Sequence, residues 1–466
     1  MNLGKAIQKH DGLRYIAGLL QLHSPGGRHR MLNQPFYTNA ADLTREFDLI
    51  EAMVKCIENT GNQNNVNNIV QGLMQLHDIR GTLNNTRAQH VLDDIELFEL
   101  KRFALISDQI LGYLEKMEFR GIYLPGLDKI IELLDPEGHR TPHFFIYPAY
   151  SDTLKTLREQ FKSFGDVQSE EAMAVYHECI EIEDSIRKEL SSKLWPLYND
   201  ISTAWEGLAA LDFLMARAQL AIDHKWVKAE VSEEITAYKG LFHPRVKAVL
   251  EKEKRSFQPW DIKLYSAPTL ITGANMAGKT VLLKTVALNQ YLFQFGFYVA
   301  ADAAEIAIVE DIMAGIGDEQ SELSGLSSFA AEMLNIQSII HRARAGCKLL
   351  VLIDEPARTT NPHEGIAIAN ALIDVLEQLG VRSLVTTHYS GLHTACRKLR
   401  VKGLRFPKGT ESITVENINR FMDYSLLEHS TDEVPREALQ IAHILQVDPE
   451  LLQRARAYAD QNEKTL

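Results

Sequence analysis

The stretch L-I-T-G-A-N-M-A-G-K-T at residues 270–280 has the residue types needed to hold phosphate. Its later part fits G-x-x-x-x-G-K-[ST], in which backbone N–H groups cradle phosphates. An apolar run over 262–272 precedes it and suits a buried strand, and apolar residues at helical spacing follow it. The loop is therefore expected between a strand and a helix N-terminus. We predict phosphate-binding roles for Gly273, Ala274, Asn275, Met276, Ala277, Gly278, Lys279 and Thr280, with Lys279 at the β- and γ-phosphates and the Thr280 hydroxyl on Mg²⁺.

Two acids follow another apolar strand further along the chain. Residues 349–353 lead into Asp354 and Glu355. Downstream of a phosphate loop, the first acid is expected to support Mg²⁺ and the second to polarise the attacking water. A third apolar segment ends in T-T-H-Y, where His388 could sense a γ-phosphate through a hydrogen bond. The pattern is equally compatible with a structural role for this histidine.

A serine-rich segment, S-E-L-S-G-L-S-S-F-A-A-E-M, covers residues 321–333. Ser327 or Ser328 is expected to cap the helix that follows. A serine at a helix start is also suited to contact phosphate, and the two roles are compatible. Two His-Glu pairs, beginning at His177 and His363, lack the second histidine of H-E-x-x-H, so a zinc protease is unsupported.

Apolar periodicity predicts that residues 1 to about 230 are almost entirely helical. Helices are expected over 43–57 and 91–113, and two or three long ones between 151 and 222. The polar stretch 59–68 is expected to be a surface loop.

Beyond residue 230, short apolar runs alternate with helical segments. This alternation is typical of a parallel or mixed sheet covered by helices. A helical tail follows at 437–460. Strands are expected at 269–272, 304–309, 348–353 and 383–385.

The composition is that of a soluble globular protein with several domains, since 45% of the 466 residues are hydrophobic and 24% are charged. No apolar run approaches membrane-spanning length, and the N-terminus lacks a signal-peptide core. Four scattered cysteines without a C-x-x-C pair favour a reducing, cytoplasmic location. The formal net charge of −13 argues mildly against nucleic acid as the main partner, because such binding normally shows a basic footprint.

Together the motifs resemble the ATPase domain of the MutS family. The match comprises T-G-A-N-M-A-G-K-T, G-L-S-S-F-A-A-E-M, L-V-L-I-D-E-P-A-R-T-T and T-T-H-Y, in this order across about 241–392. The helical half looks like the family's core and lever domain, with weaker motifs such as L-F-E-L-K. The resemblance implies a helical lever domain over 1–228, an α/β P-loop ATPase domain over 229–430 and a helical dimerisation segment over 431–466.

The resemblance also implies ATP and Mg²⁺ as cofactors and a role for single residues. Asp354 would support Mg²⁺, Glu355 would be the catalytic base, and His388 would be the switch. Ser327 would reach the γ-phosphate held by a partner subunit, so a homodimer with composite sites would follow.

The chain departs from the family's pattern in ways that bear on its client. Ala274 and Ala277 stand where the family usually has proline and glycine. Only a short helical lead precedes the lever region, and no mismatch-reading domain or C-terminal nuclease module is expected. About ten residues, between Phe161 and Glu171, stand where DNA-binding relatives insert a clamp.

Two classes of client remain open. The missing parts and the acidic charge slightly favour a protein client, as in a MutS-like subgroup associated with reactivating adenosylcobalamin-dependent aminomutases. The family at large favours DNA, as in mismatch repair or recombination. A metabolic kinase with the same loop is disfavoured, because the long helical part carries no signature of a second substrate cleft.

Overall fold

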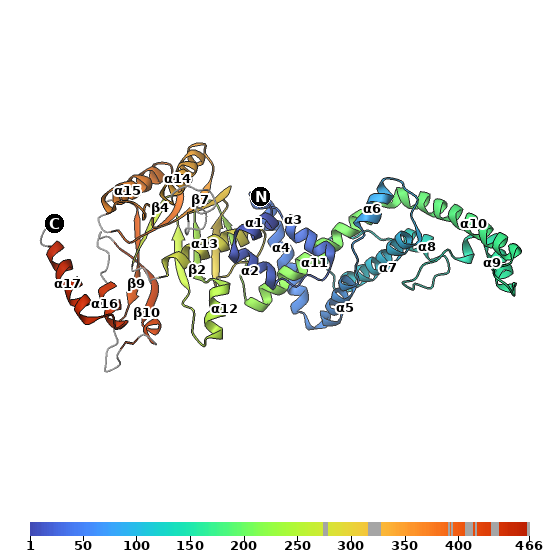
Figure 1. The fold of residues 1–466 in the computed structure, drawn as a ribbon, viewed down its shortest axis with the longest axis horizontal. Helices are drawn as coiled ribbons and strands as arrows, with labels where there is room; N and C mark the ends of the chain where they lie inside the picture. Colours follow the sequence, from blue (N-terminus) through green and yellow to red (C-terminus); the bar gives the residue numbers. More distant parts are fainter. Residues whose placement is uncertain are drawn as a thin grey trace. The chain divides into compact units, whose positions relative to one another are not determined.

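The computed structural model describes residues 1–273, 278–315, 328–389, 392, 395–405, 413–414, 417–429 and 438–463. The chain divides into two compact units, which we describe separately (Figure 1). The first consists of residues 1–5, 19–35 and 48–223, and the second of residues 6–18, 36–47 and 224–466. No helix in the described ranges is long and apolar enough to span a membrane.

The regular structure described up to residue 224 is helical, as predicted. Its α-helices are α1 (Leu3–Lys9), α2 (Asp11–Leu19), α3 (Pro25–Asn33), α4 (Ala40–Glu58), α5 (Gln63–Met74), α6 (Arg80–Arg87), α7 (Asp94–Lys116), α8 (Asp128–Leu134), α9 (Asp152–Ser163), α10 (Glu170–Leu194) and α11 (Tyr198–His224). Short 3₁₀ turns at Thr60–Asn62, Pro148–Tyr150 and Trp195–Leu197 join some of them.

The prediction of a surface loop over 59–68 is wrong. A 3₁₀ turn and the first half of α5 occupy this stretch. Val66, Ile69 and Leu73 are buried at helical spacing on α5, which packs against α7. Burial of this apolar face outweighs the modest helix propensity of the surrounding asparagines.

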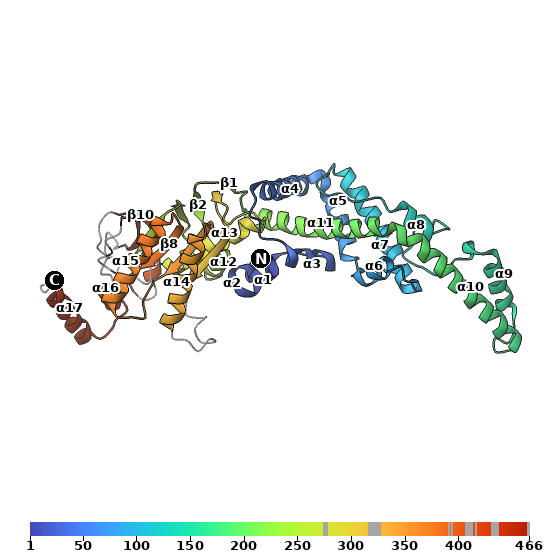
Figure 2. The ribbon, with the colours of Figure 1, turned by 90° about the horizontal axis from the view of Figure 1, so that it is seen from above.

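Helices α9 and α10 form an antiparallel hairpin, in which the two helices lie side by side in both views (Figures 1 and 2). The Ser169 side chain caps α10 by accepting the backbone N–H of Ala172 at 3.2 Å. Only residues 164–169 connect the two helices. The hairpin therefore ends in a short turn.

The second unit contains two sheets. The smaller has the order β1-β5-β2-β3, from β1 (Glu230–Ser232), β5 (Ala303–Ala307), β2 (Thr236–Leu241) and β3 (Trp260–Leu264). The larger has the order β10-β9-β4-β8-β7-β6, from β10 (Met422–Glu428), β9 (Arg397–Leu404), β4 (Pro268–Thr272), β8 (Arg382–Thr387), β7 (Leu349–Asp354) and β6 (Asp311–Gly315). All neighbours in it are parallel except the edge pair β9 and β10. The predicted strands at 269–272, 304–309, 348–353 and 383–385 correspond to β4, β5, β7 and β8.

The apolar run over 262–272 is two strands, β3 and β4, which lie in different sheets, and not the single strand that was predicted. Pro268 opens β4, a position at which proline costs no ladder hydrogen bond but restricts the residue before it. The tail is likewise two helices, α16 (Ala438–Ile444) and α17 (Pro449–Glu463). Between them Gln446 has a φ of 59°, which ends the first helix.

Helices cover the larger sheet. α13 (Lys279–Gln294), which begins directly after the phosphate loop, contacts β6, β7 and β8. Residues of α14 (Ser328–Arg344) and α15 (Pro362–Gln378) share one apolar core with β4, β7 and β8. Another helix of this unit, α12 (Pro244–Lys252), starts at a proline preceded by His243. The phosphate loop thus follows a strand that is buried between neighbours.

Candidate nucleotide site

The predicted site residues gather at one edge of the larger sheet. The phosphate loop follows β4, Asp354 and Glu355 end β7, and His388 follows β8. Because β4, β8 and β7 are adjacent and parallel, their carboxyl ends meet at the same edge. This is where ligands bind in open α/β sheets. Ala274–Ala277 and Ser327 lie outside the described residues.

Lys279 lies buried at the start of α13, with 3% of its surface exposed. Gly278, directly before it, has a φ of 74°, which a glycine adopts without strain. The Lys279 ammonium donates to the carbonyl of Gly273 at 2.6 Å and lies 3.5 Å from Oε1 of Glu355. Burial lowers the pKa of Lys279, and the negative charges of Glu355 and Asp354 oppose this shift. The cation is therefore held at the end of the loop that was predicted to bind phosphate.

Asp354 joins two hydroxyl-bearing side chains from neighbouring elements. Its Oδ2 accepts the hydroxyl of Thr280 at 2.6 Å, and its Oδ1 accepts that of Thr386 at 2.5 Å. The Thr280 side chain is exposed, so its hydroxyl is accessible to a ligand. Hydroxyl and carboxylate oxygens are the hard donors that Mg²⁺ takes alongside phosphate oxygens.

Glu355 is placed by the backbone of β8. Its N–H lies 3.1 Å from both the carbonyl and the hydroxyl oxygen of Thr386, and its φ is 52°. Its Oε2 lies 3.3 Å from Nδ1 of His388, at ion-pair distance but without the alignment of a hydrogen bond. One carboxylate thus faces both Lys279 and His388.

Glu332 and Tyr389, for which the sequence predicted no role, form hydrogen bonds with the segment after Glu355. The backbone N–H of Ala357 donates to Oε1 of Glu332 on α14 at 2.8 Å, and the hydroxyl of Tyr389 donates to the Ala357 carbonyl at 3.0 Å. Ala357 has a φ of 58°, a left-handed conformation that is uncommon for alanine. Burial raises the pKa of Tyr389, which keeps its hydroxyl protonated as a donor. The motif F-A-A-E-M contained Glu332, but nothing in the pattern indicated this contact.

An aromatic side chain beside the phosphate loop was also missed. A Cβ atom built on Gly278 would lie 3.2 Å from Cδ1 of Tyr424 on β10. The carbonyl of Tyr424 accepts the indole N–H of Trp260 at 3.0 Å, and its N–H donates to Gln258 at 3.0 Å. Trp260 is itself buried. No motif marked Tyr424, because 144 residues separate it from Thr280 and only strand pairing brings it to this edge.

Other kinds of site find no support in the described part of the chain. No three His, Cys, Asp or Glu residues there are grouped so as to hold a metal ion. Cys56, Cys179, Cys347 and Cys396 form no disulfides. The His-Glu pairs at 177 and 363 lie on α10 and α15, in different units.

Comparisons with known proteins agree with this geometry. Residues 269–462 match the family model of MutS domain V. The endonuclease MutS2 of Carboxydothermus hydrogenoformans is 31% identical over 293 residues, which cover 61% of this chain and 35% of the relative. The endonuclease MutS2 of Thermus thermophilus is 34% identical over 257 residues, which cover 54% of this chain and 32% of the relative. The endonuclease MutS2 of Ruminiclostridium cellulolyticum is 35% identical over 215 residues, which cover 45% of this chain and 26% of the relative.

The chain spans about a third or less of the length of these curated relatives. The matched region includes the phosphate loop, both acids after β7 and the histidine after β8. In this region the chain is therefore similar to MutS domain V.

Proposed function

We propose that this protein binds and hydrolyses MgATP at the edge formed by β4, β8 and β7. The observation that supports this most is the convergence of a buried ammonium, a hydroxyl–carboxylate pair and a second carboxylate at the ends of β4 and β7, on either side of β8. These are the groups that phosphoryl transfer to water uses. Lys279 and Glu355 are 76 positions apart in the sequence (355 − 279), and the proposed chemistry requires the fold to bring them together.

The residues present fit ATP and Mg²⁺. Gly273, Gly278 and the N-terminus of α13 would hold the phosphates, with Lys279 opposite the β- and γ-positions. Thr280 and Asp354 would hold Mg²⁺, which when bound neutralises charge on the phosphate oxygens. Tyr424, beside Gly278, would limit the space next to the loop.

The remaining polar groups would act on water. Glu355 would orient the attacking water and accept its proton, and His388 would fix the rotamer of that carboxylate. Glu332 and Tyr389 would hold the left-handed backbone at Ala357, so that Glu355 keeps its direction. Glu355→Gln is therefore expected to bind ATP while its turnover falls by about 10²- to 10⁴-fold. Undiminished turnover in this variant would contradict the assignment of the base.

We further propose a homodimer with composite sites, in which Ser327 of one subunit serves the nucleotide of the other and residues 431–466 contribute to the subunit contact. The support is the position of Ser327 one residue before α14 in the sequence, and the MutS domain V match. Mixing Ser327→Ala with Lys279→Ala subunits tests this. Each mixed dimer would keep one intact composite site, so activity should reappear on mixing; two inactive preparations that stay inactive would exclude composite sites.

The client is proposed to be a macromolecule, acted on through the helical unit. The relatives are named endonucleases, which favours DNA as the client over the protein client that the sequence slightly favoured. Reactivation of an aminomutase gains no support from these matches.

The first experiment measures ATP hydrolysis at near-physiological salt, with and without duplex, branched and mismatched DNA. Stimulation by one DNA form, weakening with added salt, would identify a DNA-processing ATPase. Steady hydrolysis that is indifferent to every DNA would support a protein client. Absence of hydrolysis under all conditions, with Lys279→Ala as the matched control, would contradict the proposed activity itself.

A further inference from the structure

The end of the α9–α10 hairpin carries apolar side chains that the helical unit leaves exposed. Val167 in the connecting turn is 54% exposed, and Met173 and Tyr176 on the first turns of α10 are 40% and 44% exposed. The ring of Phe161 on α9 lies 5.6 Å from that of Tyr176, centroid to centroid. We call these four residues the hairpin patch. Methionine and aromatic side chains in an exposed cluster are typical of binding surfaces.

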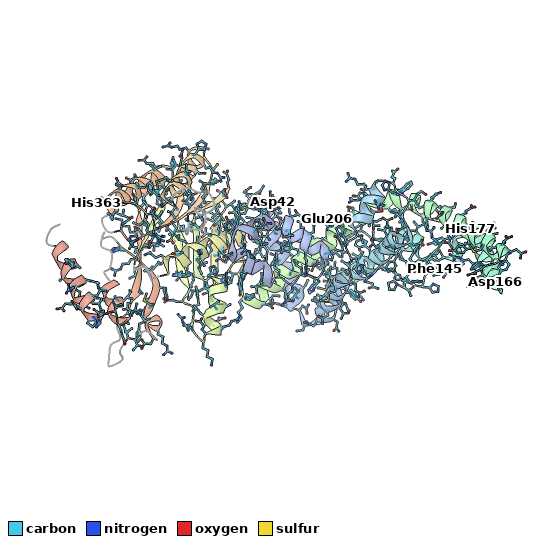
Figure 3. All side chains as sticks on the ribbon, viewed as in Figure 1. Asp42, Phe145, Asp166, His177, Glu206 and His363 are labelled. Atoms are coloured by element: carbon cyan, nitrogen blue, oxygen red, sulfur yellow. The ribbon has the colours of Figure 1, made fainter. Side chains whose placement is uncertain are left out.

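Carboxylates surround the hairpin patch. Within residues 159–181 the only Lys or Arg is Lys162. The exposed acids of this stretch form no ion pairs in the described part of the chain, and they are Glu159, Asp166, Glu170, Glu171, Glu178 and Glu181. Figure 3 shows Asp166 and His177 at this end of the hairpin.

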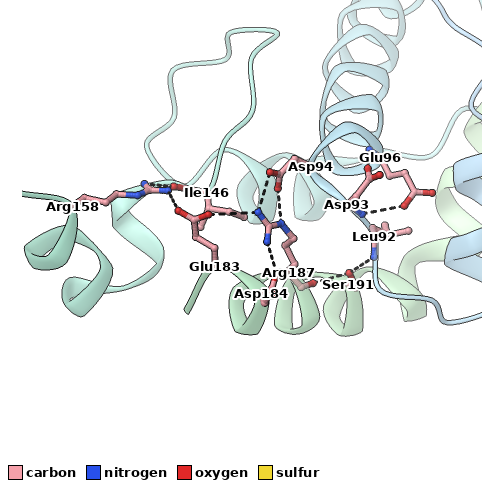
Figure 4. Close-up of polar contacts among 10 residues, drawn as sticks. All are labelled: Leu92, Asp93, Asp94, Glu96, Ile146, Arg158, Glu183, Asp184, Arg187 and Ser191. Atoms are coloured by element: carbon pink, nitrogen blue, oxygen red, sulfur yellow. Dashed lines mark hydrogen bonds and ion pairs between the residues drawn. The ribbon is translucent and has the colours of Figure 1, made fainter. Parts of the chain in front are cut away.

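In the part of the hairpin further from the turn, which we call the shaft and which includes Arg158 and residues 183–187, the acids are in ion pairs. There Arg158 lies 2.7 Å from Glu183, and Arg187 lies 2.8 Å from Asp94 and 2.6 Å from Asp184 (Figure 4). These ion pairs compensate the charges of Glu183 and Asp184. Glu170 and Glu171 lie in the first turn of α10, where their negative charges stabilise the helix N-terminus. Their presence at the tip is therefore explained by helix stability alone. This reason does not extend to Glu159, on the last turns of α9, or to Glu178 and Glu181 further along α10.

We propose that the hairpin patch is a docking surface for a basic amphipathic segment of another protein. Such a segment would cover the apolar side chains and bring lysines or arginines within reach of the unpaired carboxylates. DNA fits poorly, because its phosphates would meet carboxylates of the same sign. A second copy of this chain would likewise oppose one acidic tip to another. The surface lies wholly in the helical unit, so this inference goes beyond the proposed ATPase and does not depend on it.

The test uses the full chain and a fluorescein-labelled helical peptide with lysines on one face and leucines on the other. The chain should bind it, and should not bind the same peptide with glutamates in place of lysines. The triple variant Glu159→Lys/Glu178→Lys/Glu181→Lys should raise the Kd about tenfold or more, because three carboxylates that attract the peptide become cations that repel it. The double variant Val167→Ser/Met173→Ser should also raise it severalfold.

Matched controls separate this surface from general attraction to an acidic protein. Glu58→Lys/Glu132→Lys/Glu206→Lys makes the same change in charge at other exposed positions of the helical unit, and should leave the Kd within about twofold. Ile95→Ser/Tyr123→Ser, at side chains 69% and 74% exposed, does the same for the apolar variant.

Three results would overturn the proposal: equal weakening of peptide binding by the control variants, no binding of the peptide by the wild type, or binding of labelled duplex DNA, measured without peptide, that Val167→Ser/Met173→Ser weakens. Thermal unfolding checks that each variant folds. If the charge reversals unfold the hairpin, Glu178→Gln/Glu181→Gln replaces them, with Glu132→Gln/Glu206→Gln as its control. The ATPase rate of the variants should be unchanged, so a failure here is distinguishable from a failure of the proposed activity.

Discussion

Among the described residues, each unit buries one lysine almost completely, but the two lysines are held differently. Lys101 on α7, with no exposed surface, donates to Asp135 at 2.9 Å, to the carbonyl of His143 at 2.9 Å and to the hydroxyl of Tyr147 at 2.7 Å. Lys279 on α13 donates to a carbonyl at 2.6 Å, and its nearest carboxylate is 3.5 Å away. An ammonium has three donors, and Lys101 uses all three within the protein.

This difference in surroundings distinguishes a buried lysine with a structural role from one that is proposed to bind a ligand. The charge of Lys101 is compensated in direct hydrogen bonds by groups on and beyond α8, so it ties that segment to α7. Lys279 lies next to an exposed threonine at the open edge of a sheet, at ion-pair distance from the carboxylate of Glu355. Mutation should therefore unfold the protein in one case and abolish nucleotide binding in the other.

The largest effect is expected for Lys101→Met. Removing this cation leaves the Asp135 carboxylate buried and unpaired, which should lower the free energy of unfolding by about 3–5 kcal/mol. Urea denaturation followed by circular dichroism measures it. Adding Asp135→Leu should recover much of the loss; a double variant as unstable as the single one would show that the pair is not what matters.

Lys279→Ala should weaken nucleotide binding strongly and lower stability only slightly. Loss of the ammonium opposite the phosphates is expected to weaken ATP binding about a hundredfold or more, from about 2–5 kcal/mol of charge-assisted contact. Stability without nucleotide should change far less than in Lys101→Met. Calorimetric titration with ATP and denaturation of the same sample give both numbers. Unfolding comparable to that of Lys101→Met would remove the distinction between the two lysines.

His243 is a further buried titratable side chain, and it should make stability depend on pH. Burial, aided by Arg245 and Lys284, lowers the pKa of His243 to about 4. Because the folded pKa lies below the unfolded value, this group contributes its full stability above about pH 6.5, and the contribution, about 3 kcal/mol, is lost as pH falls through about 4. His243→Leu should flatten this part of the profile of unfolding free energy against pH. If the slope of unfolding free energy against pH is unchanged in His243→Leu, the pH dependence arises from other titratable groups.

The smallest effect concerns the backbone beside Glu355. Ala357→Gly should stabilise the protein by about 1 kcal/mol, because glycine adopts a φ of 58° without strain. Ala369→Gly, at a buried position within α15, is the matched control and should destabilise by about the same amount. Differential scanning calorimetry compares the two. Destabilisation by both would show that Ala357 carries no strain.

Much of the candidate site could be predicted from short motifs, because each motif is a short continuous stretch of sequence. The loop from Gly273, the Asp354–Glu355 pair and His388 were located by residue type and by the apolar strand in front of each. The structure brings Lys279, Thr280, Asp354, Glu355 and His388 together. Their catalytic roles remain predictions, as does that of Ser327.

Errors arose where long-range packing opposes local preference. The asparagine-rich stretch after α4 reads as a loop, yet burial of Val66, Ile69 and Leu73 against α7 makes it helical. The run 262–272 reads as one strand, yet its halves belong to different sheets. Neither outcome is visible to a window of ten residues, because the deciding partner lies elsewhere in the chain.

The sequence by itself determined the helical first half, the alternating second half and the chemistry of the phosphate loop, because these depend on local spacing and residue type. Only the tertiary structure decided which side chains support that chemistry. Glu332, Tyr389 and Tyr424 reach the site through strand order and helix packing. The pairing in the α9–α10 hairpin is likewise tertiary, since Arg158 of α9 meets Glu183 of α10, and Arg187 of α10 meets Asp94 of α7.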